Sequence, residues 1–141
     1  MPQNAMPKAD ASKTTNCMTK ECRSAVEYFS AQVAYEVMPM ALKGMMDKNA
    51  LKDVCLIDVR SIDAYKQSHV SMAMCIPLPE LAAKMSTLPK EKLVVAYGAD
   101  ADCGLAPRAC LELAQKGFKV MRLCGGFESW QQKGFPVDKK A

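Results

Sequence analysis

Apolar residues in this chain form short runs of strand length, and between these runs apolar residues recur at helical spacing. The nearly continuous runs at residues 54–60 and 93–97, rich in β-branched and aromatic residues, predict strands buried on both faces. Residues 35–37 predict a short edge strand, and residues 73–76 and 118–123 predict two further strands. The predicted helices cover residues 22–34, 39–48, 62–67, 79–88, 107–116 and 127–132. This alternation predicts an α/β fold of three layers, α/β/α, with a mainly parallel five-stranded sheet in the middle and an extra N-terminal helix.

The same pattern of apolar and polar residues divides the chain into segments. Residues 1–20 are polar, contain prolines and show no periodicity, so we expect a mobile tail there. Residues 21–34 form the N-terminal helix, residues 35–137 one domain, and residues 138–141 a C-terminal tail. A length of 141 residues suits a single domain of this kind.

The formal net charge of +4 lies mostly in the terminal segments rather than in the domain. A protein that binds nucleic acid usually presents a basic stripe interleaved with aromatic residues, and this pattern is missing. No apolar run reaches the length of about 18 residues that a membrane-spanning helix needs. We therefore expect neither nucleic acid nor a membrane as a partner.

The seven cysteines do not form a recognisable disulfide or metal pattern. Their number is odd, and the first residues contain no apolar stretch typical of a secretory signal, so we expect reduced thiols in a cytoplasmic protein. One histidine and no C-x-x-C pair argue against a metal site, and nothing in the pattern indicates a cofactor.

The loop that follows the strand at 93–97 is the predicted functional site. Gly98 ends the strand, and Pro107 suits the first turn of the next helix, because its missing N–H costs nothing there. Ala106, the residue before the proline, is a poor cap, so the first helix amides are free for water or an anion. Ligands of parallel sheets bind beyond the carboxyl ends of strands, where this loop and its thiol, Cys103, are expected.

Several spaced motifs resemble those of the rhodanese-like domains, which include single-domain sulfurtransferases. The motifs are Leu56-Ile57-Asp58-Val59-Arg60, Tyr65 with His69-Val70, Ala73 to Pro77, Val94 to Tyr97, Gly117-Phe118, Leu123 to Phe127, Trp130 and Gly134 to Val137. The resemblance covers residues 35–137 and implies the rhodanese fold. It also implies a cysteine directly after the fourth long strand, which takes sulfane sulfur as a persulfide and passes it to a nucleophilic acceptor.

The chain departs from this pattern at the nucleophile position, where it holds Gly98. Counting back from Leu113 with the spacing of shorter-looped members reaches Asp100, which is not cysteine either. The loop resembles that of members with a second cysteine midway along it, which is Cys103 here. Outside the loop, three residues stand where the family commonly has an acidic residue and two glycines: Ala64, Ser68 and Met72.

Cys103 is the candidate sulfur-carrying thiol. The helix amides and Arg108, five residues on, would stabilise a thiolate, whereas Asp100 and Asp102 would raise the thiol pKa and repel thiosulfate. We therefore expect a sulfurtransferase or persulfide carrier with weak or absent thiosulfate activity, whose partner is a small sulfur-containing donor or a protein thiol. A disulfide with another cysteine, such as Cys17, is a second way in which Cys103 could react.

The alternative function, from a different class, is a non-catalytic module whose loop amides bind an anion or a protein. The residues predicted to bind are Gly98, Ala99, Asp100, Ala101, Asp102, Gly104 and Arg108, with Arg60 from the same edge of the sheet. For Arg60, a structural ion pair with Asp58 is the competing interpretation. A phosphatase-like use of the segment from Cys103 to Arg108 fails on spacing, because that chemistry usually has one more residue before the arginine.

Overall fold

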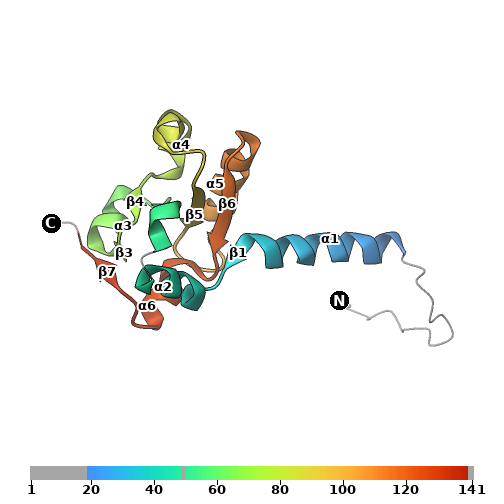
Figure 1. The fold of residues 1–141 in the computed structure, drawn as a ribbon, viewed down its shortest axis with the longest axis horizontal. Coiled ribbons are helices and arrows are strands. Elements are labelled where there is room, and N and C mark those ends of the chain that lie inside the picture. The colour runs from blue at the N-terminus through green and yellow to red at the C-terminus, as the bar shows by residue number, and fades with distance from the viewer. Residues whose placement is uncertain (1–18, 49, 140–141) are drawn as a thin grey trace. The chain divides into compact units, whose positions relative to one another are not determined.

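The computed structural model describes residues 19–48 and 50–139, and Figure 1 shows its alternating helices and strands. The helices are α1 (Lys20–Tyr35), α2 (Pro39–Asp47), α3 (Ile62–Gln67), α4 (Leu81–Lys84), α5 (Leu105–Gln115) and α6 (Gly126–Gln132). The strands are β1 (Glu36–Val37), β2 (Val54–Asp58), β3 (His69–Val70), β4 (Met74–Cys75), β5 (Leu93–Tyr97), β6 (Lys119–Leu123) and β7 (Val137–Asp138). Three short 3-10 helices complete the described elements: η1 (Ala50–Asp53), η2 (Leu78–Glu80) and η3 (Met85–Thr87).

Five strands form the central sheet in the order β1-β6-β5-β2-β4, and every neighbouring pair is parallel. The central strand β5 pairs with β2 along its whole length, from Leu93 opposite Val54 to Tyr97 opposite Asp58. The prediction of a parallel five-stranded sheet is therefore confirmed. The carboxyl ends of β2, β5 and β6 meet at one edge of this sheet, and the functional residues follow these ends.

Each face of the sheet packs against its own helices, which makes three layers. On one face α4 and α5 cover Ile57 of β2 and Ala96 of β5. On the other face α2 and α6 cover Leu56 and Val95, and Trp130 of α6 is fully buried. Successive strand residues thus enter opposite cores, which is why both faces of each strand are apolar.

Helix α5 begins two residues before Pro107, the residue at which its start was predicted. We placed the start at Pro107 with Ala106 before it, but the helix begins at Leu105 and its N-cap is Gly104. Pro107 is the third residue of the helix, where a backbone N–H would have no intrahelical acceptor, so the helix starts before the proline without losing a hydrogen bond. Gly104 supplies no side-chain cap, so the expected uncapped helix start is present.

The sequence pattern does not predict the second, two-stranded sheet. In this sheet β3 and β7 are antiparallel, with His69 opposite Asp138 and Val70 opposite Val137. Strands of two residues are too short to produce a recognisable alternation of apolar and polar residues. Asp138, which we assigned to the C-terminal tail, belongs to this sheet.

The residues before Ala34 form a unit separate from the rest of the chain. Its described part is nearly all of α1, so the predicted N-terminal helix is confirmed. The Thr19 hydroxyl oxygen accepts a hydrogen bond from the Cys22 N–H at 3.2 Å, as expected of an N-cap residue. The predicted tail at 1–20 lies almost entirely outside the described residues, as does Cys17.

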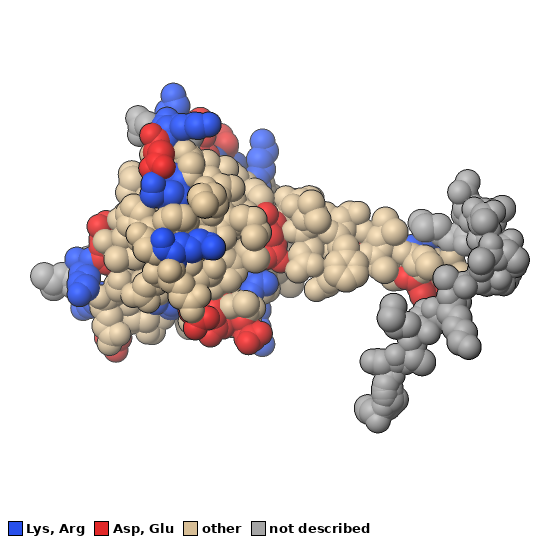
Figure 2. Space-filling view, turned by 90° about the horizontal axis from the view of Figure 1, so that it is seen from below, with Lys and Arg blue, Asp and Glu red and all other residues tan. Residues whose placement is uncertain are grey.

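The charges of the domain are mixed on the face seen in Figure 2, where basic and acidic side chains are interspersed. Over residues 19–48 and 50–139, no helix is both long enough and apolar enough to cross a bilayer.

Candidate active site

The loop of residues 98–104 joins β5 to α5 at the carboxyl edge of the sheet. Its start is fastened to the beginning of α6 by two backbone hydrogen bonds. The Phe127 N–H donates to the Gly98 carbonyl at 2.9 Å, and the Glu128 N–H donates to the Ala99 carbonyl at 2.8 Å. The first two residues of the loop are therefore held by backbone from another part of the chain.

Gly126 lies directly against the start of the loop. A Cβ at this position would lie 2.7 Å from the Gly98 carbonyl oxygen and 2.9 Å from the Asp100 nitrogen, which is too close for any side chain. Its φ of +62° is also a conformation that favours glycine. The close packing of the loop on α6 thus depends on a glycine at residue 126.

A turn that begins at Asp100 shapes the middle of the loop. The Asp102 N–H donates to Oδ1 of Asp100 at 3.0 Å, and the Cys103 N–H donates to the Asp100 carbonyl at 3.3 Å. Asp100 is half-buried, whereas Ala101 and Asp102 are exposed. This turn brings the chain back toward β5 before α5 begins.

The thiol of Cys103 consequently lies beside the residue that ends β5. A Cβ on Gly98 would lie 2.7 Å from Cys103 Sγ and 3.2 Å from Cys103 Cβ. The same point is 3.7 Å from the backbone nitrogen of Ala106, in the first turn of α5. The half-buried Cys103 side chain therefore fills the space that a side chain at residue 98 would need.

The amino end of α5 contributes uncapped amides to the site. The N-cap Gly104 makes no side-chain hydrogen bond, and the first turn carries no acidic residue. The positive end of the helix dipole is thus free to stabilise a nearby anion, an effect of about 0.3–1 kcal/mol at exposed sites. Arg108, in the next turn, is exposed.

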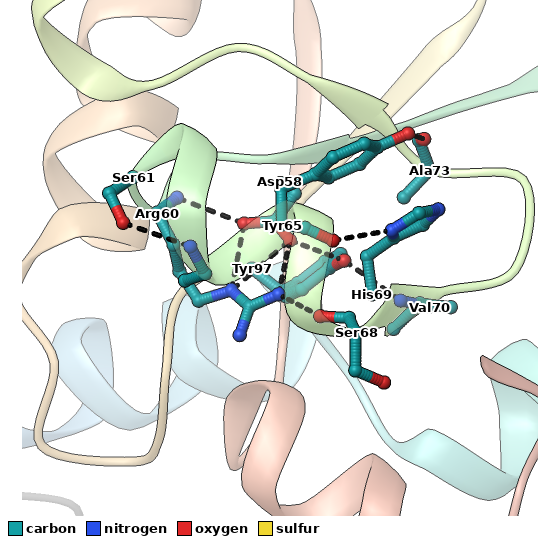
Figure 3. A network of polar contacts seen from close by, with 10 residues as sticks. Asp58, Arg60, Ser61, Tyr65, Ser68, His69, Val70, Ala73 and Tyr97 are labelled. Carbon is teal, nitrogen blue, oxygen red and sulfur yellow. Dashed lines mark hydrogen bonds and ion pairs between the residues drawn. The ribbon is translucent and has the colours of Figure 1, made fainter. Parts of the chain in front are cut away.

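A buried polar network lies at the ends of β2 and β5, next to the loop (Figure 3). Asp58 is fully buried, and its Oδ2 accepts hydrogen bonds from Arg60 Nη2 at 2.6 Å and from the Tyr97 hydroxyl at 2.8 Å. Arg60 also donates to the Ser68 carbonyl at 2.7 Å, and the Val70 N–H donates to the Tyr97 hydroxyl at 3.0 Å. Both ends of the buried ion pair are therefore satisfied from several elements.

The protonation states of this network follow from its burial. Burial raises the pKa of the Tyr97 hydroxyl well above its usual range, and the charge of Asp58 raises it further, so Tyr97 remains a donor. Burial alone would lower the pKa of Arg60, but the hydrogen bond and the charge of Asp58 outweigh it and the pKa is raised. The carboxylate thus has a neutral donor and a cationic donor.

Arg60 connects the network to the loop. Its guanidinium carbon lies 4.4 Å from the centroid of the Phe127 ring, and the Phe127 N–H holds the Gly98 carbonyl. The Arg60 side chain is only 10% exposed, and its hydrogen bonds go to Asp58 and the Ser68 carbonyl. This geometry favours the structural interpretation of Arg60 over direct ligand contact.

His69, the one histidine of the chain, has a structural environment. Its ring stacks on the Tyr65 ring with centroids 3.7 Å apart, and its Nδ1 lies 2.7 Å from the Tyr65 carbonyl oxygen. The Tyr65 hydroxyl donates to the Ala73 carbonyl at 2.7 Å. These contacts hold the β3 segment on α3 rather than presenting a base to the loop.

A cleft of about 340 Å³ opens beside the first turn of α5. It is lined by Val59, Arg60, Ser61, Ile62, Asp63, Pro77, Pro79, Glu80 and Leu105. Glu80 is paired with Lys84 at 3.0 Å, and Arg60 is already paired with Asp58. Among these described lining residues, Asp63 is therefore the charged side chain that has no ion pair.

Two other thiols near this edge of the sheet have partners that disfavour reactivity. Burial raises the pKa of Cys110 to about 11, and its Sγ donates to the Met121 carbonyl at 3.6 Å. Burial also raises the pKa of Cys124, as does a hydrogen bond to Glu36. Both thiols remain protonated near neutral pH. Within the described segments, no three His, Cys, Asp or Glu side chains are grouped to hold a metal ion.

The structure brings the predicted loop residues together with the start of α5, while Arg60 faces its buried partner. Sequence reasoning missed Gly126, Phe127 and Arg122, whose Nη2 donates to the Ala101 carbonyl at 2.7 Å. The glycine pair after β6 was interpreted only as a turn. Its position after a strand that borders β5 was the signal that could have identified it as a loop contact.

Comparison with known proteins identifies a family that matches this chain. The rhodanese-like domain family matches residues 38–133. A sulfurtransferase of Allochromatium vinosum is 32% identical over 90 residues, 61% of this chain and 79% of that protein. The HTH-type transcriptional regulator Rv0324 of Mycobacterium tuberculosis is 37% identical over 89 residues, 63% of this chain but only 39% of the regulator.

The fold agrees with this match. The crystal structure of the BH2092 protein from Bacillus halodurans superposes with a TM-score of 0.73 at 28% identity, over 83% of this chain and 85% of that one. Because the family match covers well over half of the sequence, this chain belongs to the rhodanese-like domain family.

Proposed function

We propose that this domain is a sulfurtransferase or persulfide carrier in which Cys103 holds the sulfur. The observation that carries the proposal is the 2.7 Å between Cys103 Sγ and the point where a residue-98 Cβ would stand. The resemblance to rhodanese-like domains implies a nucleophile at residue 98. Cys103 is five residues away in sequence but adjacent to that position in space.

The proposed loading step adds one sulfur atom to Cys103 and forms a persulfide, which increases the mass of the protein. The Cys103 thiolate attacks the sulfane sulfur of thiosulfate, a new S–S bond forms to Cys103, and the S–S bond of thiosulfate breaks to release sulfite. An acceptor thiolate then attacks the outer sulfur of the Cys103 persulfide. That step returns the Cys103 thiolate and leaves the persulfide on the acceptor.

The first amides of α5 supply stabilisation for the anionic sulfur. Gly104 leaves them uncapped, and a Cβ on Gly98 would lie 2.7 Å from Cys103 Sγ and 3.7 Å from the Ala106 nitrogen. Backbone donors at a helix N-terminus suit a thiolate or a persulfide anion for the same reason that they suit phosphate. The amides are supplied by the fold, so they do not depend on which residue carries the thiol.

Two carboxylates in the loop set the expected donor preference. Asp100 and Asp102 lie three and one residues before Cys103, and both repel the doubly charged thiosulfate ion. We expect slow loading from thiosulfate and faster loading from a protein persulfide. Raising the ionic strength screens the repulsion and should accelerate the thiosulfate reaction.

Intact-mass analysis after incubation with thiosulfate or polysulfide tests the proposal. We expect a gain of one sulfur atom that disappears in Cys103→Ser and persists in Cys124→Ser, the matched control. The double variant Asp100→Asn/Asp102→Asn should load severalfold faster from thiosulfate. If no donor adds sulfur to the parent protein, the proposal is wrong and the non-catalytic binding module is the better account.

A further inference from the structure

Arg122 links the loop to the edge of the sheet. It lies on β6, with its backbone opposite Ala96 of β5 on one side and Glu36 of β1 on the other. Its Nη2 donates to the Ala101 carbonyl at 2.7 Å, and its Nη1 lies 4.0 Å from Oε2 of Glu36. One guanidinium therefore bridges the edge strand and the middle of the loop.

This bridge acts on the half of the loop that carries the thiol. The carbonyls of Gly98 and Ala99 are held by α6, but the bonds at Asp100 are internal to the loop. In the part of the chain that the structure describes, the hydrogen bond from Arg122 is the one that reaches residues 100–104 from outside the loop and α5. The position of Cys103 therefore depends on Ala101 being held.

The surroundings of Arg122 restrict the orientation of its guanidinium. Its side chain is 21% exposed and that of Glu36 is 18% exposed, so the pair is partly shielded from water. Glu36 thus helps to orient the guanidinium that donates to the Ala101 carbonyl.

We infer that Arg122 is a positioning residue for sulfur transfer, which holds the Ala101 carbonyl so that Cys103 Sγ stays beside Gly98. This inference rests on the proposed function, since it assigns a role in the same reaction. Glu36 acts one step further back, by orienting Arg122. Neither side chain touches the sulfur.

The experiment compares two reactions of Cys103 in the parent protein and in Arg122→Gln. Sulfur loading from polysulfide requires the cradle, whereas alkylation by neutral iodoacetamide requires only an accessible thiolate. We expect loading to fall roughly tenfold in Arg122→Gln, the factor that corresponds to loss of one charge-assisted hydrogen bond. Alkylation of Cys103, followed by peptide mass spectrometry across pH, should not fall.

Two further variants separate positioning from charge. Arg122→Lys keeps the charge and one donor group but cannot bridge both partners, so it should recover only part of the loading rate. Glu36→Gln should reduce loading about threefold in the parent and have no effect in the Arg122→Gln background, because both act through one contact. Thermal unfolding of each variant confirms that the folded protein is being measured.

Three outcomes would overturn the inference. Unchanged loading in Arg122→Gln would show that the bridge only supports the fold. An equal fall in loading and alkylation would show that Arg122 acts through the charge on the thiolate. A parent protein that takes up no sulfur at Cys103 would instead refute the proposed function, and the role of Arg122 in it would fall too.

Discussion

Two groups of residues meet at the carboxyl edge of the sheet and are held in opposite ways. The network of Asp58, Arg60 and Tyr97 is buried, and its charges are satisfied by side chains and backbone from several elements. The loop of residues 98–104 is largely exposed and depends on a few hydrogen bonds to its backbone. The buried network and the loop therefore depend on separate sets of contacts.

Breaking the buried network should give the largest effect on stability. Asp58→Ala leaves Arg60 as an unpaired charge in a buried site, and we expect the free energy of unfolding to fall by about 3–5 kcal/mol. Asp102→Ala, in the exposed loop, should cost less than about 1 kcal/mol. Urea denaturation followed by circular dichroism measures both. Equal losses in the two variants would contradict the distinction between network and loop.

The contact between the loop and Gly126 of α6 should give the next largest effect on stability. Gly126→Ala places a Cβ 2.7 Å from the Gly98 carbonyl oxygen in a backbone with a φ of +62°, and we expect a loss of about 2–4 kcal/mol. The control is Gly134→Ala, where φ is +71° but no atom lies within 4 Å of the new Cβ. It should cost only about 1 kcal/mol. A similar loss in both variants would mean that contact with the loop is unimportant.

The pH dependence of stability probes the helix that follows the loop. Burial raises the pKa of Cys110 from 9.0 to about 11, so the folded state keeps a proton that the unfolded chain releases. This contribution is fully present below pH 9 and is lost as pH rises toward 11, by up to about 2–3 kcal/mol. Unfolding free energies measured from pH 8 to 11 under reducing conditions should fall less steeply in Cys110→Ala. An unchanged slope would show that Cys110 does not titrate in this range on unfolding.

Met72, close to the buried network, offers a small gain in stability, because its backbone has a positive φ. Met72 has a φ of +74° and is 69% exposed, so it adopts a left-handed conformation without burying its side chain. Met72→Gly should therefore stabilise the protein by up to about 1 kcal/mol, measured as a shift in the denaturation midpoint. Met38→Gly, at an exposed residue of ordinary extended backbone, should give no gain.

The sequence predicts the parts of the fold that depend on local pattern. The strand at 93–97 and the helix at 62–67 were predicted with their observed bounds, because the first is apolar on both faces and the second begins after a capping serine, Ser61. The pairing of β3 with β7 was not predicted, because it joins two-residue segments from distant parts of the chain.

The loop between β5 and α5 was predicted in position but not in geometry. The end of β5 and the uncapped start of α5 identified the loop. The loop that carries Cys103 contacts Gly126 and Arg122, which are distant in sequence and carry no local signal. From the sequence alone, Gly98 suggests that a nucleophile is missing. In the folded chain, the Cys103 thiol lies beside Gly98.

Moving the thiol back to residue 98 tests the central claim most directly. In Gly98→Cys/Cys103→Ala, the alanine lacks the Sγ that a Cβ at residue 98 would approach to 2.7 Å, and the new Cβ lies 3.7 Å from the Ala106 nitrogen. The account predicts that Cys103→Ala takes up no sulfur from polysulfide and that the double variant regains a persulfide, mapped by peptide mass spectrometry to residue 98. A folded double variant that carries no sulfur at residue 98 would contradict it.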